Sequence, residues 1–264
     1  MDLQLKGRRA LVTGSTAGIG FAIARALAAE GAEVLINGRD PQRVDAAIDA
    51  LGRELPGAQL RAAAADLSCA DGAATLLAAH PAVDILVNNL GIYEAASFED
   101  IDDADWQRFF DVNVMSGVRP SRHYLPRMVA AGWGRIVFIS SESGLCTPPD
   151  MVHYGMTKTA QLALSRGLAE TTSGTGVTVN AVLPGPTRTE GAVAFLSAMA
   201  AEKGLTLAEA EALFFTEHRP SSLARRFVEP AEVASLVAYV CSPLSSATNG
   251  AALRADGGVV RTIA

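Results

Sequence analysis

Short apolar runs rich in valine and isoleucine alternate with longer helical patterns from Arg9 to about Leu183. This alternation is typical of βαβ units, in which parallel strands are joined by helices that cross back over the sheet. Several runs have no polar interruption, as expected for strands that are covered on both faces. We therefore predict strands at Ala10–Thr13, Glu33–Asn37, Gln59–Ala64, Asp84–Asn88, Arg135–Ser140, Val177–Val182 and Ala251–Ala255.

These strands predict an α/β fold of the doubly wound Rossmann type, with one seven-stranded parallel sheet and helices on both faces. A chain of 264 residues is within reach of one α/β domain, so we expect a single domain over residues 1–264. The alternation of strand and helix patterns is interrupted at about residues 187–228, where helical patterns at Glu190–Lys203 and Thr206–His218 precede a polar stretch. This excursion is either a lid over the substrate or a plain helical hairpin on the surface, and the sequence leaves both open.

Composition and charge narrow the class of ligand. A formal net charge of −6 argues against a general nucleic-acid binder, which needs a basic surface. No stretch has the length and apolar character of a membrane span, and no secretion signal is evident, so we expect a cytoplasmic protein that is not bound to a membrane. Cys69, Cys146 and Cys241 are widely spaced, which implies neither a disulfide framework nor a zinc site. We expect a small-molecule ligand and no metal.

The segment TGSTAGIG, residues 13–20, connects the first predicted strand to the first helical pattern. Gly14 ends the strand, and Gly18 and Gly20 open the helix, whose first backbone N–H groups favour a pyrophosphate. Glycine at these positions also lets the backbone approach the phosphates closely. A tight turn that needs positive φ is the competing interpretation, because a glycine triplet alone is a weak signal.

Six motifs, in order from about residue 7 to 258, resemble those of the short-chain dehydrogenase/reductase family. They are TGxxxGIG at 13–20, Asp66-Leu67, Asn88-Asn89-Leu90-Gly91, YxxxK at 154–158, PGxxxT at 184–189 and Asp256-Gly257-Gly258. Leu90 stands where the family usually has alanine, which would narrow the space beside the cofactor ribose. The resemblance implies an NAD(P)-dependent oxidoreductase that is a dimer or tetramer, so we expect a homo-oligomer.

The resemblance also implies which residues bind the cofactor. They are Gly14, Ser15, Thr16, Gly18, Ile19, Gly20, Asn37, Arg39, Asp66, Leu67, Asn89, Gly91, Tyr154, Lys158, Pro184, Gly185, Thr187 and Thr189. In a Rossmann unit, an acid at the end of the second strand favours NAD. Here Gly38 takes the place of that acid and Arg39 follows, whose guanidinium suits a phosphate. This favours NADP(H) over NAD(H), although Ala17 replaces a second basic residue often seen in NADP-type loops.

Four residues match the catalytic set of the family. Tyr154 and Lys158 are four residues apart on a predicted helix, so their side chains share one face. The resemblance assigns Tyr154 to proton transfer with the substrate oxygen and Lys158 to the nicotinamide ribose. We expect the ammonium, together with an oxidised nicotinamide, to lower the pKa of Tyr154 toward neutrality. Ser141 matches the serine that hydrogen-bonds the substrate carbonyl, with Ser140 on the opposite side of the strand, and Asn113 matches the asparagine of the proton relay.

The implied reaction is hydride transfer between nicotinamide and the ketone or secondary alcohol of a small, partly apolar molecule. Candidate pocket residues are Tyr93, Glu94, Glu142, Ser143, Met151, His153, Phe195 and Met199. Reduction of a 3-oxoacyl thioester on acyl-carrier protein is an alternative. It is less favoured because Gly132 and Thr175 stand where such reductases tend to carry basic residues. A non-catalytic NADP(H)-binding module is a further alternative, and the intact catalytic set argues against it.

Overall fold

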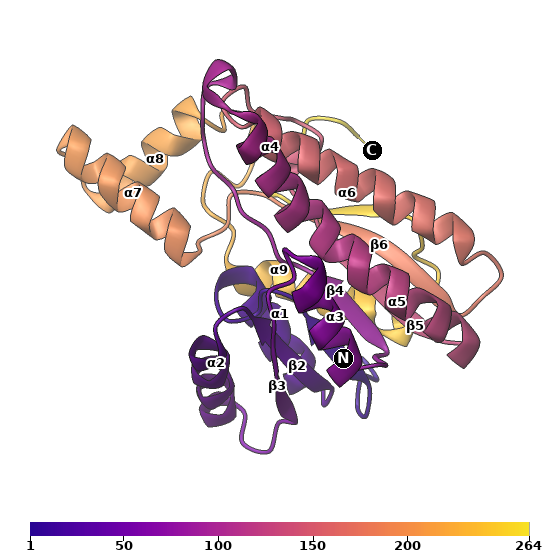
Figure 1. Ribbon diagram of the computed structural model, residues 1–264. Helices are drawn as coiled ribbons and strands as arrows, with labels where there is room; N and C mark the ends of the chain where they lie inside the picture. The colour runs from indigo at the N-terminus through magenta and orange to yellow at the C-terminus, as the bar shows by residue number, and fades with distance from the viewer. Residues whose placement is uncertain (264) are drawn as a thin grey trace.

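A seven-stranded parallel sheet runs through the computed structural model, which describes residues 1–263 (Figure 1). The strands are β1 (Arg9–Val12), β2 (Glu33–Gly38), β3 (Leu60–Ala64), β4 (Ile85–Asn88), β5 (Gly134–Ile139), β6 (Val177–Pro184) and β7 (Ala252–Ala255). Their order in the sheet is β3-β2-β1-β4-β5-β6-β7, and every neighbouring pair is parallel. The predicted sheet is confirmed, and each predicted strand ends within two residues of the observed one. Residue 264, the end of the predicted domain, lies outside the described residues.

Helices follow the strands along most of the chain. The α-helices are α1 (Gly18–Ala29), α2 (Pro41–Glu54), α3 (Ala70–Ala79), α4 (Asp103–Phe110), α5 (Ser116–Ala131), α6 (Val152–Thr171), α7 (Glu190–Lys203), α8 (Leu207–Glu217) and α9 (Pro230–Cys241). Shorter turns of helix are η1 (Phe98–Asp100), η2 (Asp111–Met115), η3 (Glu142–Gly144) and η4 (Pro243–Ser245). The η2 segment is a π turn, and it joins α4 directly to α5.

Both faces of the sheet are covered, because successive strand residues point to opposite sides. In β1, Ala10 and Val12 pack into the hydrophobic cluster that includes residues of α1, α2 and α9. Leu11 packs into the other cluster, with residues of α3, α5 and α6. Three helices on each side of one parallel sheet are the doubly wound arrangement that the alternating pattern predicts.

Residues 187–228, which we call the lobe, leave the sheet after β6 and carry α7 and α8 away from the body (Figure 1). The lobe has a hydrophobic cluster of its own, in which Leu196, Met199 and Phe215 are buried. The Arg188 guanidinium forms an ion pair of 2.8 Å to Glu211 within the lobe and one of 2.8 Å to Glu229, which lies just outside it at the start of α9. The lobe is therefore held by its own packing and ion pairs in addition to its contacts with the body.

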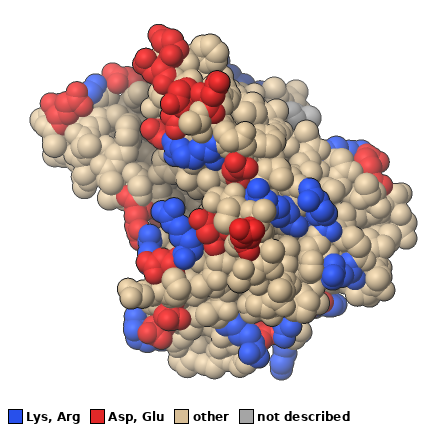
Figure 2. Space-filling model, in the orientation of Figure 1, with Lys and Arg blue, Asp and Glu red and all other residues tan. Residues whose placement is uncertain are grey.

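The surface carries charges of both signs. Acidic and basic side chains are interspersed over the face shown in Figure 2, and the same view shows a hollow between the lobe and the body. Among the helices within residues 1–263, none is both long and apolar enough to cross a membrane. Within the same residues, no group of three His, Cys, Asp or Glu side chains is placed to hold a metal ion.

Candidate active site

The glycine turn between β1 and α1 has a conformation that needs glycine. Gly14 and Gly18 have φ values of +61° and +56°, in the left-handed region that other residues rarely adopt. A Cβ on Gly20 would lie 2.3 Å from the backbone oxygen of Gly14, so close packing excludes a side chain there. The first two glycines therefore have the positive φ of a tight turn, which is compatible with a bound phosphate.

The start of α1 also fits a pyrophosphate. The residue before the helix, Ala17, has no side chain that could accept a hydrogen bond, and α1 has no side-chain cap. The first backbone N–H groups of a helix lack intrahelical acceptors, and they carry a partial positive charge. An uncapped helix start beside a glycine turn is thus able to bind a phosphate group of a dinucleotide.

Several predicted cofactor residues hold the turn in shape. Ser15 Oγ donates to the end of β1 and accepts Asn37 N at 2.9 Å. Asn37 Oδ1 accepts Gly14 N at 3.1 Å, and its amide group donates to the end of β3. Asn89 Nδ2 donates to the Gly14 oxygen at 3.1 Å, while the Leu67 side chain lies in the core. These side chains are engaged within the protein, so their effect on a cofactor runs through the backbone they position.

The ends of β2 and β3 bring a cation and an acid to one side of the glycine turn. Gly38 faces the turn, since a Cβ there would lie 2.7 Å from Thr16 Cγ2. Arg39 follows and is exposed. Hydrogen bonds from Ser68 hold the pKa of Asp66 below its ordinary value, and the positive charge of Arg39 adds to this effect. Arg39 is thus within electrostatic reach of Asp66, beyond the carboxyl ends of both strands.

The segment after β6 lies against the glycine turn from the other side. Pro184 ends β6, and Gly185 packs so closely on the turn after β7 that a Cβ would meet its backbone at 2.5 Å. Thr187 Oγ1 donates to the Gly185 oxygen. Thr189 caps α7, and its methyl group would lie 3.3 Å from a Cβ on Gly18. In α1, Ile19 packs partly buried against the core. The glycine turn therefore lies between the strand ends and the first residues of the lobe.

Tyr154, Lys158 and Ser141 come together at the carboxyl end of β5. Lys158 Nζ lies 5.6 Å from the centre of the Tyr154 ring, as expected for residues one turn apart on α6. The Lys158 ammonium donates to the Ile139 oxygen at 3.0 Å and to Gln161 Oε1 at 3.2 Å. Ser141 Oγ is within hydrogen-bonding reach of the Tyr154 hydroxyl. Ser140 Oγ instead donates to the Lys158 backbone oxygen, so it is the hydroxyl of Ser141 that lies at Tyr154.

Asn113 joins the loop after β4 to α6. Its Oδ1 accepts Ile92 N at 2.8 Å, and its Nδ2 donates to the Ile92 oxygen and to Thr157 Oγ1. A Cβ on Gly91 would lie 3.3 Å from Lys158 Nζ and 3.4 Å from Asn113 Oδ1. Asn113 lies in the π turn η2, a distortion that recurs at functional sites. The four predicted catalytic residues are thus brought into one region.

Burial dominates the ionisation of the two central groups. It raises the pKa of Tyr154 above its ordinary value, against the opposing effect of its hydrogen bond with Ser141. It lowers the pKa of Lys158 to about 7. For the protein alone, the direction at Tyr154 is therefore opposite to the expected one. The expectation overlooked that Lys158 is itself desolvated and that its N–H groups are directed at Ile139 and Gln161.

Some candidate pocket residues border the site. Tyr93 is exposed, and its ring meets the Tyr154 ring edge-on at a centroid distance of 6.4 Å. Its hydroxyl touches α7, since a Cβ on Gly191 would lie 2.2 Å from Tyr93 Oη. Glu94 forms an exposed ion pair with Arg108 at 2.9 Å. Tyr93 thus links the loop after β4 both to Tyr154 and to the lobe.

Other candidate pocket residues are placed differently from the expectation. Met199 is buried in the lobe's own cluster, and His153 is buried against Phe109, with ring centroids 3.9 Å apart. Both side chains contribute to cores. Phe195 is about half exposed, Met151 is half-buried, and Ser143 is buried beside Glu142. Helical periodicity indicates which face of a helix is apolar, but not which neighbouring element covers that face. This is why Met199 and His153 were expected in the pocket although they pack in cores.

Two polar residues of the site were not predicted. Gln161 accepts from Lys158 Nζ and donates to the Asn113 backbone oxygen. Its position, three residues after Lys158 and seven after Tyr154, places it on the same helix face, so helical spacing could have identified it. Arg219 reaches the site from the lobe, and no local signal in its polar stretch points there.

Comparison with known proteins agrees with this geometry. The sequence model of the short chain dehydrogenase family matches residues 8–199, which is most of the chain. The chain belongs to the short-chain dehydrogenase/reductase family. It is accordingly an oxidoreductase of the EC 1.1.1 type that uses a nicotinamide cofactor and acts on small alcohols or ketones.

Individual relatives cover the whole of this short-chain dehydrogenase/reductase. The Bacillus subtilis (strain 168) oxidoreductase YvaG is 52% identical over 100% of both chains. A D-beta-hydroxybutyrate dehydrogenase from Cupriavidus necator is 34% identical over 97% of this chain and 99% of its own. A crystal structure of L-sorbose reductase from Gluconobacter frateurii, complexed with NADPH and L-sorbose, is 28% identical. It superposes with a TM-score of 0.93 over 100% of both chains.

Proposed function

We propose that this enzyme transfers a hydride between NADP(H) and the ketone or secondary alcohol of a small, partly apolar molecule. The observation that carries the proposal is the convergence of Asn113, Ser141, Tyr154 and Lys158 beyond β4 and β5, beside a glycine turn with an uncapped helix start. In an open parallel sheet, this crevice is where ligands bind.

The roles of the residues follow from their positions. NADP(H), when bound, supplies or accepts the hydride at its nicotinamide. In the direction of reduction, Tyr154 Oη donates a proton to the substrate oxygen, and in oxidation it takes that proton back. Ser141 Oγ donates a hydrogen bond to the same oxygen and stabilises its developing charge. Asn113 fixes the loop after β4 against α6, which keeps Gly91 beside Lys158 Nζ.

The preference for NADP(H) rests on the end of β2. Arg39 is exposed there, and Gly38 leaves no acidic side chain that would repel a phosphate. The relative L-sorbose reductase was crystallised with NADPH, which supports the same cofactor here. Arg39→Ala should lower kcat/KM for NADPH about 10- to 100-fold, the value of a charge-assisted contact, and leave that for NADH nearly unchanged. Equal effects on both cofactors would contradict this assignment.

We further infer one catalytic domain in which the lobe acts as the lid. Tyr93 contacts both the Tyr154 ring and α7, so the lobe begins at the edge of the candidate site. A lobe with its own core can close over a substrate as a unit and exclude water from the reacting groups.

The test is a panel of carbonyl compounds followed by nicotinamide absorbance. The panel contains L-sorbose, acetoacetate and an acetoacetyl thioester with NADPH, and the corresponding alcohols with NADP⁺. Turnover of at least one pair is expected, and Tyr154→Phe should lower its kcat about 10²- to 10⁴-fold while NADPH binding is retained. Binding of NADPH without turnover of any member of the panel would contradict the proposed hydride transfer and favour a non-catalytic binding module.

A further inference from the structure

A part-buried ion pair joins the lobe to the loop that carries Ser141. Glu142 follows Ser141 directly and is 4% exposed. Its Oε1 accepts from Arg219 Nε at 2.9 Å, although Arg219 lies 77 residues further along the chain. Removing two charges from water costs free energy, and this cost is offset only where the geometry is good. The contact therefore connects two distant segments at the catalytic serine.

The second carboxylate oxygen of Glu142 accepts hydrogen bonds from the loop that contains Ser141 and Ser143. Oε2 accepts from Ser141 Oγ, from Ser143 N at 2.7 Å and from Ser143 Oγ at 2.9 Å. With both oxygens engaged, Glu142 has its acceptors directed at the protein, so its influence on a substrate runs through Ser141. A serine hydroxyl carries one proton, and a proton donated to Glu142 is not available to a substrate oxygen.

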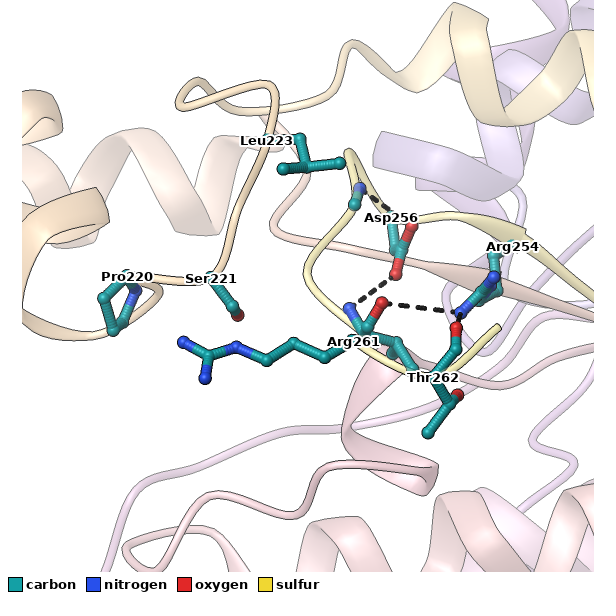
Figure 3. Close-up of a pocket in the computed structure, with 9 residues that line it drawn as sticks. Pro220, Ser221, Leu223, Arg254, Asp256, Arg261 and Thr262 are labelled. Carbon is teal, nitrogen blue, oxygen red and sulfur yellow. Dashed lines mark hydrogen bonds between the residues drawn. The ribbon is translucent and has the colours of Figure 1, made fainter. Parts of the chain in front are cut away.

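The backbone around Arg219 is fixed on both sides. Arg219 N donates to the Phe214 oxygen at the end of α8. After it, Ser221 Oγ donates to the Val259 oxygen at 2.7 Å. Pro220 and Ser221 line one side of a cavity of about 700 Å³, across from the C-terminal turn in which Asp256 holds two backbone N–H groups (Figure 3). The backbone of Arg219 is therefore anchored to α8 on one side and, through Ser221, to the C-terminal turn on the other.

We propose that Arg219 and Glu142 form a relay that couples the lobe to the hydroxyl of Ser141. Glu142 is a positioning residue whose carboxylate accepts the hydrogen bond of the Ser141 hydroxyl. Arg219 weakens that hydrogen bond because its positive charge partly neutralises the carboxylate. With Arg219 in place, Ser141 can turn its proton toward a substrate oxygen at low cost. Without it, the unpaired carboxylate retains that proton. The inference rests on the proposed function, because it concerns the hydroxyl that contacts the substrate.

The same pair acts on the Tyr154 hydroxyl in opposite directions. The negative charge of Glu142 raises the pKa of Tyr154, and the positive charge of Arg219 lowers it, in addition to the larger effect of burial. The other groups that face Tyr154 are Lys158 on its own helix, Ser141 and Tyr93. Neutralising Arg219 should therefore raise the pKa of Tyr154, and neutralising Glu142 should lower it. A merely structural contact would give no such opposition.

The experiment measures kcat and KM against pH for alcohol oxidation with NADP⁺, using the alcohol of the panel with the highest turnover. Arg219→Gln should lower kcat about 10- to 100-fold with little change in KM, and should move the acidic limb of the profile to higher pH. Glu142→Gln should move that limb to lower pH, and the double variant should return it toward the wild-type position. Arg219→Lys, which keeps the charge, should retain most of the wild-type profile.

The matched control is Arg226→Gln, because Arg226 is an exposed arginine of the same lobe that pairs with Glu232 at 2.8 Å. It should keep the wild-type profile. Thermal unfolding and NADPH binding check that each variant is folded. Should Arg219→Gln fail to fold, Glu142→Gln, whose acidic limb should lie at lower pH, and the double variant, whose limb should return toward the wild-type position, carry the test.

Two results would overturn the relay. One is an acidic limb at the same pH in wild type and in every variant at Glu142 and Arg219. The other is a rise in KM with unchanged kcat on loss of Arg219. If the wild type itself turned over no member of the panel, the proposed function would be refuted together with the relay. If the wild type is active but the acidic limbs of the Glu142 and Arg219 variants lie at the wild-type pH, only the relay is refuted.

Discussion

The buried ammonium of Lys158 should make the stability of this enzyme depend on pH. Lys158 is 4% exposed, and burial lowers its pKa from an ordinary 10.5 to about 7. Between these two values the unfolded chain binds a proton that the folded chain does not. Stability therefore rises with pH from about 7 to 10.5, and the full cost of charging the lysine is present below pH 7.

The perturbation that isolates this effect is Lys158→Met, which removes the charge and keeps an unbranched apolar side chain. A tenfold change in an acid constant is worth about 1.4 kcal/mol, so the folded chain loses about 5 kcal/mol when Lys158 is charged. Between pH 6 and pH 9, roughly 3 kcal/mol of this cost disappears as the folded lysine loses its proton. In a chain of this size, that corresponds to roughly 5 to 10 °C in melting temperature.

The assay is thermal unfolding of the cofactor-free wild type and Lys158→Met at pH 6 and pH 9, at one protein concentration. The packing and hydrogen bonds lost in the variant lower its melting temperature equally at both pH values. A change with pH in the melting-temperature difference between the two proteins therefore reports the charge. The melting temperature of the variant, relative to that of the wild type, should be higher at pH 6 than at pH 9. Lys6→Met, at an exposed position, is the control and should show no such change. The same difference at both pH values would refute a desolvated ammonium at Lys158.

Three further predictions concern the turn, the lobe and assembly. Gly20→Ala would place a methyl group 2.3 Å from the Gly14 oxygen, so NADPH affinity in a fluorescence titration should fall sharply. Gly52→Ala, in open space, should not affect it. Arg188→Gln removes the ion pair within the lobe to Glu211 and the one that joins the lobe to Glu229, so hydrogen exchange should increase in α7 and α8 and not in the sheet. Sedimentation should give a dimer or tetramer, and a monomer at micromolar concentration would contradict the expected homo-oligomer.

The sheet and α7 could be predicted because their signals are local. Each strand is an apolar run that ends at a change of composition, and its burial follows from a parallel sheet with two covered faces. The predicted bounds of α7 match the observed ones because both ends are encoded in sequence. Thr189 caps its start, and Gly204, with φ of +66°, ends it in the left-handed conformation.

The electrostatics of the site could not be predicted in this way. The pKa of Tyr154 depends on how deeply α6 is buried and on Arg219, which arrives from a segment with no periodic relation to the helix. Similarly, the sequence did not indicate that the side chains of Asn37 and Asn89 hold Gly14 in place. A motif specifies which residue types meet, whereas the hydrogen-bond partners that orient them come from the rest of the fold.

Lys158 and Glu142 show two solutions for a buried charge beside the same tyrosine. Glu142 has a counter-charge from the lobe, so its charge is compensated inside the protein. For Lys158, burial is the cause of its shifted pKa, and Ile139 and Gln161 take two of its N–H groups. An ammonium has three donors and a neutral amine has two, so only the charged form has an N–H left for a ribose hydroxyl. The pH range that favours the fold is therefore the range in which this donor is lost, so the proposed contact of Lys158 with the nicotinamide ribose comes at the expense of stability.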